Sequence, residues 1–145
     1  MKDWNNNFME LSKHIALWSK DVNTKTGAVI VDRNNRILSV GYNGFPSGCN
    51  DEVMSRYERP QKYLWTEHAE RNAIYSAVRN GISLMDAIIY VMWFPCADCA
   101  RAIIQSGISK IVCYEPNLND QKWGEHFKVA LEMFNECGVE IVFLT

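Results

Sequence analysis

The first hydrophobic pattern of the chain spans residues 4–20, where apolar side chains recur at a roughly helical spacing and predict a helix. These side chains are Phe8, Leu11, Ile15, Leu17 and Trp18. Two runs rich in β-forming residues follow at 27–32 and 36–43, and the polar stretch 33–35 separates them. We expect these two runs to form a hairpin with a polar turn.

Beyond residue 65, helical and strand patterns alternate. Thr66 has the side chain of a helix cap, and the predicted helix runs to about Asn80 and ends at Gly81. Strand patterns follow at 87–94, 110–115 and 139–144, and helical patterns lie between them at 97–107 and 123–137. This alternation implies crossover connections and an α/β sheet that is covered by helices on both faces.

The segment 44–65 is the longest irregular stretch, with two glycines and two prolines among mixed charges. Long loops in compact domains are often functional. The chain has 145 residues, 48% of them hydrophobic, which suits one domain over 1–145 with a sizeable core.

The charge and cysteine content narrow the class of protein. A net charge of −2 argues against binding a polynucleotide, which calls for a basic face, but leaves room for a small anionic ligand. The chain shows neither a signal-peptide pattern nor an apolar run of about 18 residues, so we expect no membrane contact. Five cysteines are an odd number, which argues against a complete disulfide framework and favours a reducing, cytoplasmic compartment.

Two short motifs carry the candidate chemistry. His68 and Glu70 lie near the start of one predicted helix, and Cys96 and Cys99, which follow Pro95, lie near the start of the next. A Cys-x-x-Cys pair at a helix start directs both sulfur atoms to one point, and ligand sites of open α/β sheets gather at such strand ends. The two helix N-termini favour thiolate over thiol.

The ligand set of His68, Cys96 and Cys99 fits Zn²⁺, which prefers imidazole and thiolate ligands in tetrahedral geometry. Three protein ligands leave a fourth position for water, whose pKa zinc lowers towards neutrality. Glu70 lies two residues after His68 and can reach that water without being a ligand, as a proton shuttle must. The sequence therefore predicts one catalytic zinc ion per chain.

Other interpretations of the same residues exist. The two cysteines could form a redox pair, but a thioredoxin-like context is missing. Cys49 could complete a four-ligand structural zinc site. The joint spacing of His-x-Glu and Pro-Cys-x-x-Cys is much more specific than either motif alone, and it matches the pattern known for zinc deaminases.

These motifs resemble those of the cytidine and deoxycytidylate deaminase superfamily. Five stretches resemble the deoxycytidylate (dCMP) deaminases in particular, and together they span most of the chain: 19–31, 41–51, 68–74, 94–108 and 134–142. The most discriminating is Gly-Tyr-Asn-Gly-Phe-Pro-Ser-Gly-Cys at 41–49. The resemblance implies hydrolytic deamination of dCMP to dUMP and a three-layer α/β/α fold with a five-stranded mixed sheet.

The resemblance also implies roles for single residues. His68, Cys96 and Cys99 match the zinc ligands, and Glu70 matches the proton shuttle. Asn43 matches a sugar contact, and the backbone of Ala69 matches the amide that binds the pyrimidine carbonyl. We further expect Lys25 to contact the phosphate, with Arg56, Arg59 and Lys62 of the 44–65 loop as alternatives.

The family resemblance further implies a homo-oligomer, either a hexamer or a dimer, that is regulated by dCTP and dTTP, with Mg²⁺ accompanying the triphosphate. Three positions depart from the family pattern. Before His68, Trp65 and Glu67 replace a small or cysteine-bearing stretch. Arg71 replaces a smaller neutral residue and is interpreted as an interface charge or as a phosphate contact. Trp93 is expected in the apolar core, with the substrate or effector pocket as the alternative. Because only His14 and His126 remain, we expect no second zinc site.

Three other functions remain open at this point. The first is a deaminase of another base, nucleoside or nucleotide, such as cytidine, guanine or a modified base. The second is a polynucleotide editor, which the acidic charge balance and the lack of a basic aromatic groove disfavour. The third is a zinc-holding binding module without turnover, which the presence of Glu70 disfavours.

Overall fold

The computed structural model of the chain describes residues 2–145, which form one mixed sheet with helices on both faces. The sheet order is β2-β1-β3-β4-β5. The strands are β1 (Gly27–Val31), β2 (Ile37–Tyr42), β3 (Ile88–Val91), β4 (Lys110–Tyr114) and β5 (Glu140–Leu144). Strand β1 is antiparallel to β2 and β3, whereas β3, β4 and β5 are mutually parallel. The five-stranded mixed sheet expected from the family resemblance is confirmed.

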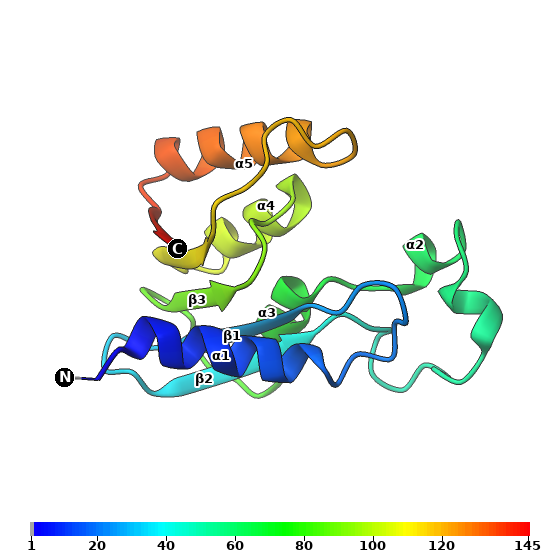
Figure 1. Cartoon of the computed structure of the whole chain (residues 1–145). Helices are drawn as coiled ribbons and strands as arrows, with labels where there is room; N and C mark the ends of the chain where they lie inside the picture. Colours follow the sequence, from blue (N-terminus) through cyan, green and yellow to red (C-terminus); the bar gives the residue numbers. More distant parts are fainter. Residues whose placement is uncertain (1) are drawn as a thin grey trace.

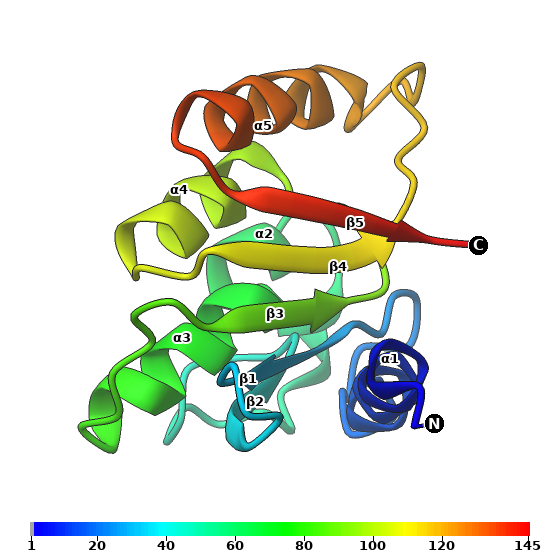
Figure 2. The ribbon, with the colours of Figure 1, turned by 90° about the vertical axis from the view of Figure 1, so that its left-hand side faces the viewer.

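The helices divide unequally between the two faces of the sheet (Figures 1 and 2). One face is covered by α1 (Trp4–Ala16), and the other by α3 (Ala69–Arg79), α4 (Ala97–Gln105) and α5 (Gly124–Glu136). This arrangement confirms the expected three-layer α/β/α architecture. Within residues 2–145, none of the helices has the length and apolarity needed to cross a bilayer.

Strand β1 contributes side chains to two separate hydrophobic clusters, because successive side chains of a strand point to opposite faces of the sheet. Ala28 and Ile30 belong to the cluster shared with α3, α4 and α5. Val29 and Val31 belong to the cluster on the α1 side, where Phe8 also packs. All five residues of β1 are buried, which explains its continuous apolar sequence.

Helix α3 lies unusually close to the sheet at Gly41 of β2. A Cβ atom at this position would come within 2.3 Å of the Ala73 nitrogen and 2.6 Å of the Ala69 carbonyl oxygen, so only glycine fits. Ser39, on the same strand, donates a hydrogen bond of 2.7 Å to the Ala73 carbonyl. These contacts fix the N-terminal half of α3 against the sheet.

The long segment 44–65 contains two short helices, η1 (Met54–Tyr57) and α2 (Lys62–Trp65). The prediction that Thr66 caps the following helix is wrong, because Thr66 ends α2 and His68 is the cap of α3. The reason is a two-way backbone bridge in which Gly44 and Glu67 exchange hydrogen bonds of 3.1 Å and 2.8 Å. This bridge holds the backbone extended just before His68 and joins the segment to the end of β2.

Candidate active site

Three potential metal ligands converge where α3 and α4 begin. His68 is the N-cap of α3, Cys96 is the N-cap of α4, and Cys99 lies in the first turn of α4. The Nδ1 atom of His68 lies 3.5 Å from Cys96 Sγ and 3.4 Å from Cys99 Sγ, and the three ligand atoms all lie within 4.8 Å of one another. The structure therefore brings together the three residues that the sequence predicted as ligands.

The spacing of these atoms fits a tetrahedral zinc site. Zinc bonds of about 2.0–2.1 Å to nitrogen and about 2.3 Å to sulfur, set at a tetrahedral angle, place the two donors roughly 3.6 Å apart. The observed separations between nitrogen and sulfur are 3.5 and 3.4 Å. Both cysteines are unpaired thiols and buried, as a zinc ligand of this type requires.

The two thiols differ in how readily each loses its proton. The hydrogen bond from Cys99, with a further contribution from His68, lowers the pKa of Cys96 to about 4 despite its burial. The pKa of Cys99 is raised because its thiol donates to Cys96 and because it is buried. A zinc ion bound at this position would take both sulfur atoms as thiolates, so its binding would release any proton that they carry.

Glu70 is 6% exposed in the first turn of α3. Burial raises the pKa of the Glu70 carboxyl, and the nearby positive charge of His68 lowers it by less. A carboxyl group with a raised pKa exchanges protons more readily near neutral pH than an exposed one. Its position two residues from His68 places this carboxyl beside the ligand cluster without making it a member.

The first residues of α5 contact the start of α4, which carries two of the three candidate metal ligands. His126 Nδ1 accepts a hydrogen bond of 3.1 Å from the Ala97 backbone N–H, which lies between the two cysteines in sequence. The ring of Trp123 stands edge-on to the His68 ring, with 6.2 Å between the centroids, and its centroid also lies 5.2 Å from that of the His126 ring. His126 therefore has a structural partner at the start of α4.

Asn43 lies at the end of β2 and is buried. Its side-chain oxygen accepts from the Thr26 N–H and its nitrogen donates to the Thr24 carbonyl, both at 2.8 Å. These bonds fix the orientation of the amide, and each of its atoms retains capacity for one more hydrogen bond. The predicted sugar contact of Asn43 stays a prediction.

The other predicted substrate contacts also stay predictions. Lys25 is exposed, and its Nζ atom donates to the Ser19 carbonyl. Ala69 is the first residue of α3, where backbone N–H groups have no acceptor within the helix. Its N–H therefore has no acceptor within the helix, and Ala69 itself is buried.

Arg71 pairs with Glu67 one helical turn away, with 2.7 Å between Nε and the carboxylate oxygen. Burial acts to lower the pKa of Arg71, but the neighbouring Cys99, Glu67 and Cys96 raise it more. The proposed roles of Arg71 at an interface or a phosphate remain predictions. By contrast, Trp93 is 54% exposed, so the expectation that it lies in the core is wrong.

A cavity of about 520 Å³ is lined by both residues of the bridge between Gly44 and Glu67. Asn43, Glu67 and Tyr75 line it, but the three metal ligands and Glu70 do not. The cavity is therefore a neighbour of the metal site and not the metal site itself.

Sequence reasoning missed the residues that surround the ligand cluster on the α5 side. Tyr63 lies on α2, whereas Lys122 and Trp123 directly precede α5, and none of the three belongs to a spaced motif. One signal was present, because residues 115–123 follow the carboxyl end of a parallel strand, where ligand sites of such sheets form.

Comparison with known families gives one match over most of the chain. The family described as the cytidine and deoxycytidylate deaminase zinc-binding region matches residues 2–115. This range contains the three candidate zinc ligands and Glu70.

Individual relatives agree with this match. The chain is 44% identical to an uncharacterized deaminase of Aliivibrio fischeri over 142 residues, which covers 97% of this chain and 93% of the relative. It is 35% identical to the deoxycytidylate deaminase of Homo sapiens, with 94% and 77% of the two chains covered. The crystal structure of dCMP deaminase from cyanophage S-TIM5 in apo form superposes with a TM-score of 0.77 at 25% identity, covering 99% of this chain and 100% of the other.

Proposed function

The chain belongs to the cytidine and deoxycytidylate deaminase family, and on this premise we propose that it hydrolyses dCMP to dUMP and ammonia. The observation that carries the proposal is a buried Glu70 beside a His-Cys-Cys cluster whose spacing suits zinc. The 35% identity to a deoxycytidylate deaminase over 94% of the chain supports dCMP as the substrate.

His68, Cys96 and Cys99 would hold the zinc ion, and a bound zinc supplies the Lewis acidity that lowers the pKa of a water molecule. Glu70 accepts the proton of that water and passes it to N3 of the pyrimidine. The water oxygen bonds to C4, and Glu70 then carries the second proton of that water to the amino nitrogen at C4. The water oxygen becomes the new carbonyl oxygen as the bond between C4 and nitrogen breaks, and ammonia leaves.

The remaining contacts orient the nucleotide. The Ala69 N–H donates to the pyrimidine carbonyl oxygen, and Asn43 binds the sugar through the capacity left on its amide. Lys25 contacts the phosphate, for which its ammonium must leave the Ser19 carbonyl. The fixed side chain of Asn43 favours binding of the sugar in one orientation, because this side chain loses little conformational freedom on binding.

We also propose that the protein is a cytoplasmic homo-oligomer, a hexamer or a dimer, that responds to dCTP and dTTP with Mg²⁺. The five unpaired cysteines support a reducing compartment. The cavity of about 520 Å³ beside Asn43 has room for a second small ligand. Light scattering with and without each triphosphate tests both the assembly and its response.

A panel of substrates tests the reaction. The zinc-loaded protein should release ammonia from dCMP with a higher kcat/KM than from deoxycytidine, cytidine, guanine or a single-stranded DNA oligonucleotide. Preferred turnover of another base or nucleoside would instead support the second candidate, a deaminase that uses the same Glu70 chemistry on a different substrate. Turnover of none of these substrates by zinc-loaded protein would contradict both.

A further inference from the structure

One side-chain nitrogen of α3 contacts both chain segments that lead into the site. Asn72 Nδ2 donates a hydrogen bond of 2.8 Å to the Tyr42 carbonyl oxygen and a longer one of 3.4 Å to the Glu67 carbonyl oxygen. Tyr42 directly precedes Asn43, and Glu67 directly precedes His68. A primary amide nitrogen carries two N–H groups, so both of them are used. Asn72 therefore joins the residue before the predicted sugar contact to the residue before a candidate metal ligand.

The peptide group between Tyr42 and Asn43 is held on both sides. Its N–H, which belongs to Asn43, donates to the Thr26 carbonyl oxygen at 3.2 Å, and its C=O accepts the bond from Asn72. The N–H and C=O of a trans peptide point in opposite directions, so the Tyr42 carbonyl points away from Thr26. Because β2 is an edge strand, a donor for this carbonyl has to come from outside the sheet. The Asn72 side chain is that donor, and it fixes the plane of the peptide that carries Asn43.

Asn72 is anchored on the metal side by its own backbone. Its N–H donates to the carbonyl oxygen of His68, the N-cap of α3, at 2.9 Å. The Glu67 carbonyl oxygen accepts from the Gly44 N–H at 3.1 Å as well as from Asn72. The spacing between Asn43 and His68 thus depends on the Gly44–Glu67 bridge and on Asn72. Of these two connections, a side-chain substitution can remove only that of Asn72.

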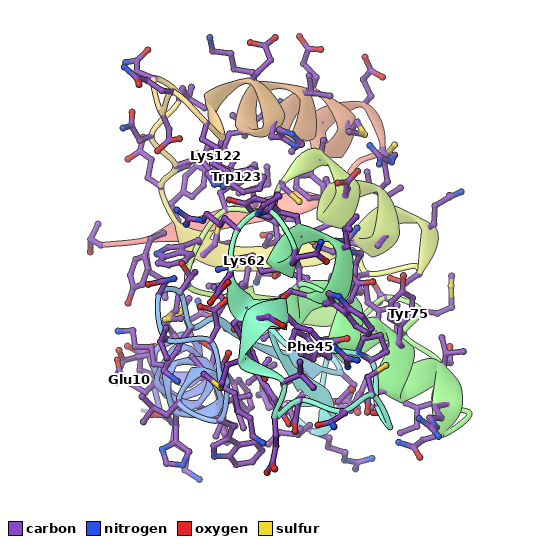
Figure 3. All side chains as sticks on the ribbon, turned by 90° about the vertical axis from the view of Figure 1, so that its right-hand side faces the viewer. Glu10, Phe45, Lys62, Tyr75, Lys122 and Trp123 are labelled. Atoms are coloured by element: carbon purple, nitrogen blue, oxygen red, sulfur yellow. The ribbon has the colours of Figure 1, made fainter. Side chains whose placement is uncertain are left out.

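The surroundings of Asn72 restrict its side chain before any ligand arrives. Asn72 is half-buried, and the next residue of α3 packs directly on Gly41 of β2. The labelled Phe45 and Tyr75 in Figure 3 mark the two segments that Asn72 connects, which are the chain after β2 and helix α3, and both rings line the same cavity. A side chain that is fixed in this way keeps Asn43 in place in the free protein, which lowers the entropy cost of binding there.

We propose that Asn72 is a positioning residue, which holds Asn43 at the spacing from the metal ligands that lets the Asn43 amide meet the 3′-hydroxyl of the deoxynucleotide. The inference rests on the proposed function, because it takes Asn43 as the sugar contact and places the base at the metal ligands. The 3′-hydroxyl is the one free hydroxyl of the dCMP sugar, and it can both donate to and accept from an amide. Asn72 acts through the Tyr42 carbonyl and makes no contact with the substrate.

The test compares dCMP with 2′,3′-dideoxycytidine monophosphate, which lacks that hydroxyl. Zinc-loaded wild type should favour dCMP by about tenfold in kcat/KM, because the shortened substrate leaves the Asn43 amide unpaired. Asn72→Leu removes both N–H donors at similar size, and the preference should fall to about twofold as Asn43 loses its position. The isosteric Asn72→Asp should show the same fall, and it serves if the leucine variant does not fold.

Two results of this comparison would overturn the proposal. One is the absence of a preference for dCMP in the wild type. The other is a wild-type preference in the Asn72 variants. If Asn72 only supported the metal ligands, its loss would slow both substrates equally and leave the preference unchanged.

Ser39→Ala is the matched structural control. It removes the hydrogen bond of 2.7 Å between Ser39 and the Ala73 carbonyl, which also fixes α3 against β2, and it leaves the donors of Asn72 in place. This variant should unfold at a lower urea concentration and keep the wild-type preference for dCMP. An equal fall of the preference in Ser39→Ala and Asn72→Leu would mean that general loosening of α3 is the cause, and it would overturn the proposal.

A double variant separates an action through Asn43 from any other route. Asn43→Ala should by itself lower the preference for dCMP to about twofold. Adding Asn72→Leu should change the preference no further, since the contact through which Asn72 acts is already lost. A second fall of the same size in the double variant would show that Asn72 acts independently of Asn43, which would overturn the proposal.

Binding of the product gives a readout that does not depend on turnover. Calorimetry should show that wild type binds dUMP about tenfold more tightly than 2′,3′-dideoxyuridine monophosphate, and that Asn72→Leu reduces this difference to about twofold. Ammonia release from dCMP by the wild type, with the full wild-type preference in Asn72→Leu, would overturn the inference and leave the proposed function standing. The expected loss of binding preference in Asn72→Leu, with no deamination by zinc-loaded wild type, would uphold the inference and overturn the proposed function.

Discussion

Lys62 and Asp21 form a buried ion pair, with 2.8 Å between Nζ and Oδ2 and side chains that are 8% and 5% exposed. The other carboxylate oxygen of Asp21 accepts from the backbone N–H groups of Asn23 and Thr24. The Thr24 carbonyl in turn accepts from the Asn43 side chain. The ion pair therefore attaches the loop around Asp21 and Thr24 to α2, and this loop in turn orients the Asn43 side chain.

Removing one partner of this pair should destabilise the protein. Lys62→Met leaves the buried Asp21 carboxylate without its counter-charge, and we expect the free energy of unfolding to fall by about 3 kcal/mol. Urea denaturation at neutral pH measures this change. The double variant Asp21→Asn with Lys62→Met should lose clearly less than the sum of the two single variants, and strict additivity would contradict coupling between these residues.

The same pair should make stability depend on pH in the acid range. Burial acts to raise the pKa of Asp21, but hydrogen bonds from Lys62 and two backbone N–H groups outweigh it, so the pKa lies below its ordinary value. A lowered folded-state pKa adds stability above the unfolded pKa of about 3.9, and that stability is lost as the pH falls through the folded pKa. The stability difference between wild type and Asp21→Asn should thus be constant at about pH 5–7 and shrink below about pH 4. A stability difference between wild type and Asp21→Asn that grows as the pH falls would contradict a lowered pKa of Asp21.

His126 should support metal binding although it is not a ligand. His126→Ala removes the acceptor of the Ala97 N–H, which loosens the start of α4, and we expect the zinc affinity to fall about tenfold. Competition with a zinc chelator measures this affinity. His126→Asn, which can offer a side-chain oxygen to the same N–H, should recover part of the loss, whereas equal affinity in wild type and His126→Ala would exclude this support.

Metal content gives an independent check on the ligand set. Purified protein should contain one zinc ion per chain, and Cys99→Ser should contain less than about a tenth of that after dialysis, because a hydroxyl is a far weaker zinc ligand than a thiolate. Cys49→Ser, which changes an exposed cysteine, should keep the full content. Two zinc ions per chain, or zinc loss in the Cys49 variant, would contradict the three-ligand site.

The parts of the site that sequence could predict are those encoded by local spacing. His68 and Glu70 are two residues apart, and Cys96 and Cys99 are three apart, so each pair is placed by one helix start. The alternating helices and strands then bring the two helix starts to the same edge of the sheet. Most helix and strand boundaries could also be predicted, because the apolar periodicity of a segment reflects which of its faces is buried.

The rest depends on contacts between distant segments. The pairing of Lys62 with Asp21 joins residues 41 positions apart, and the Tyr63–Lys122 bond joins residues 59 positions apart. No local pattern indicates such partners. The misplaced cap at Thr66 has a similar cause, since the deciding bridge runs from Glu67 to Gly44. Trp93 was misplaced because its size and hydrophobicity suggested burial, whereas the turn after β3 exposes it.

Ammonia release from dCMP by wild type and by Glu70→Ala tests the central claim most directly. Zinc-loaded wild type should convert dCMP to dUMP with one ammonia per turnover. Glu70→Ala should keep its zinc and lose at least about 10³-fold in kcat, because it removes the carboxyl group that moves the protons between water and the pyrimidine. Full activity in zinc-loaded Glu70→Ala, or no release of ammonia from dCMP by zinc-loaded wild type, would contradict the account.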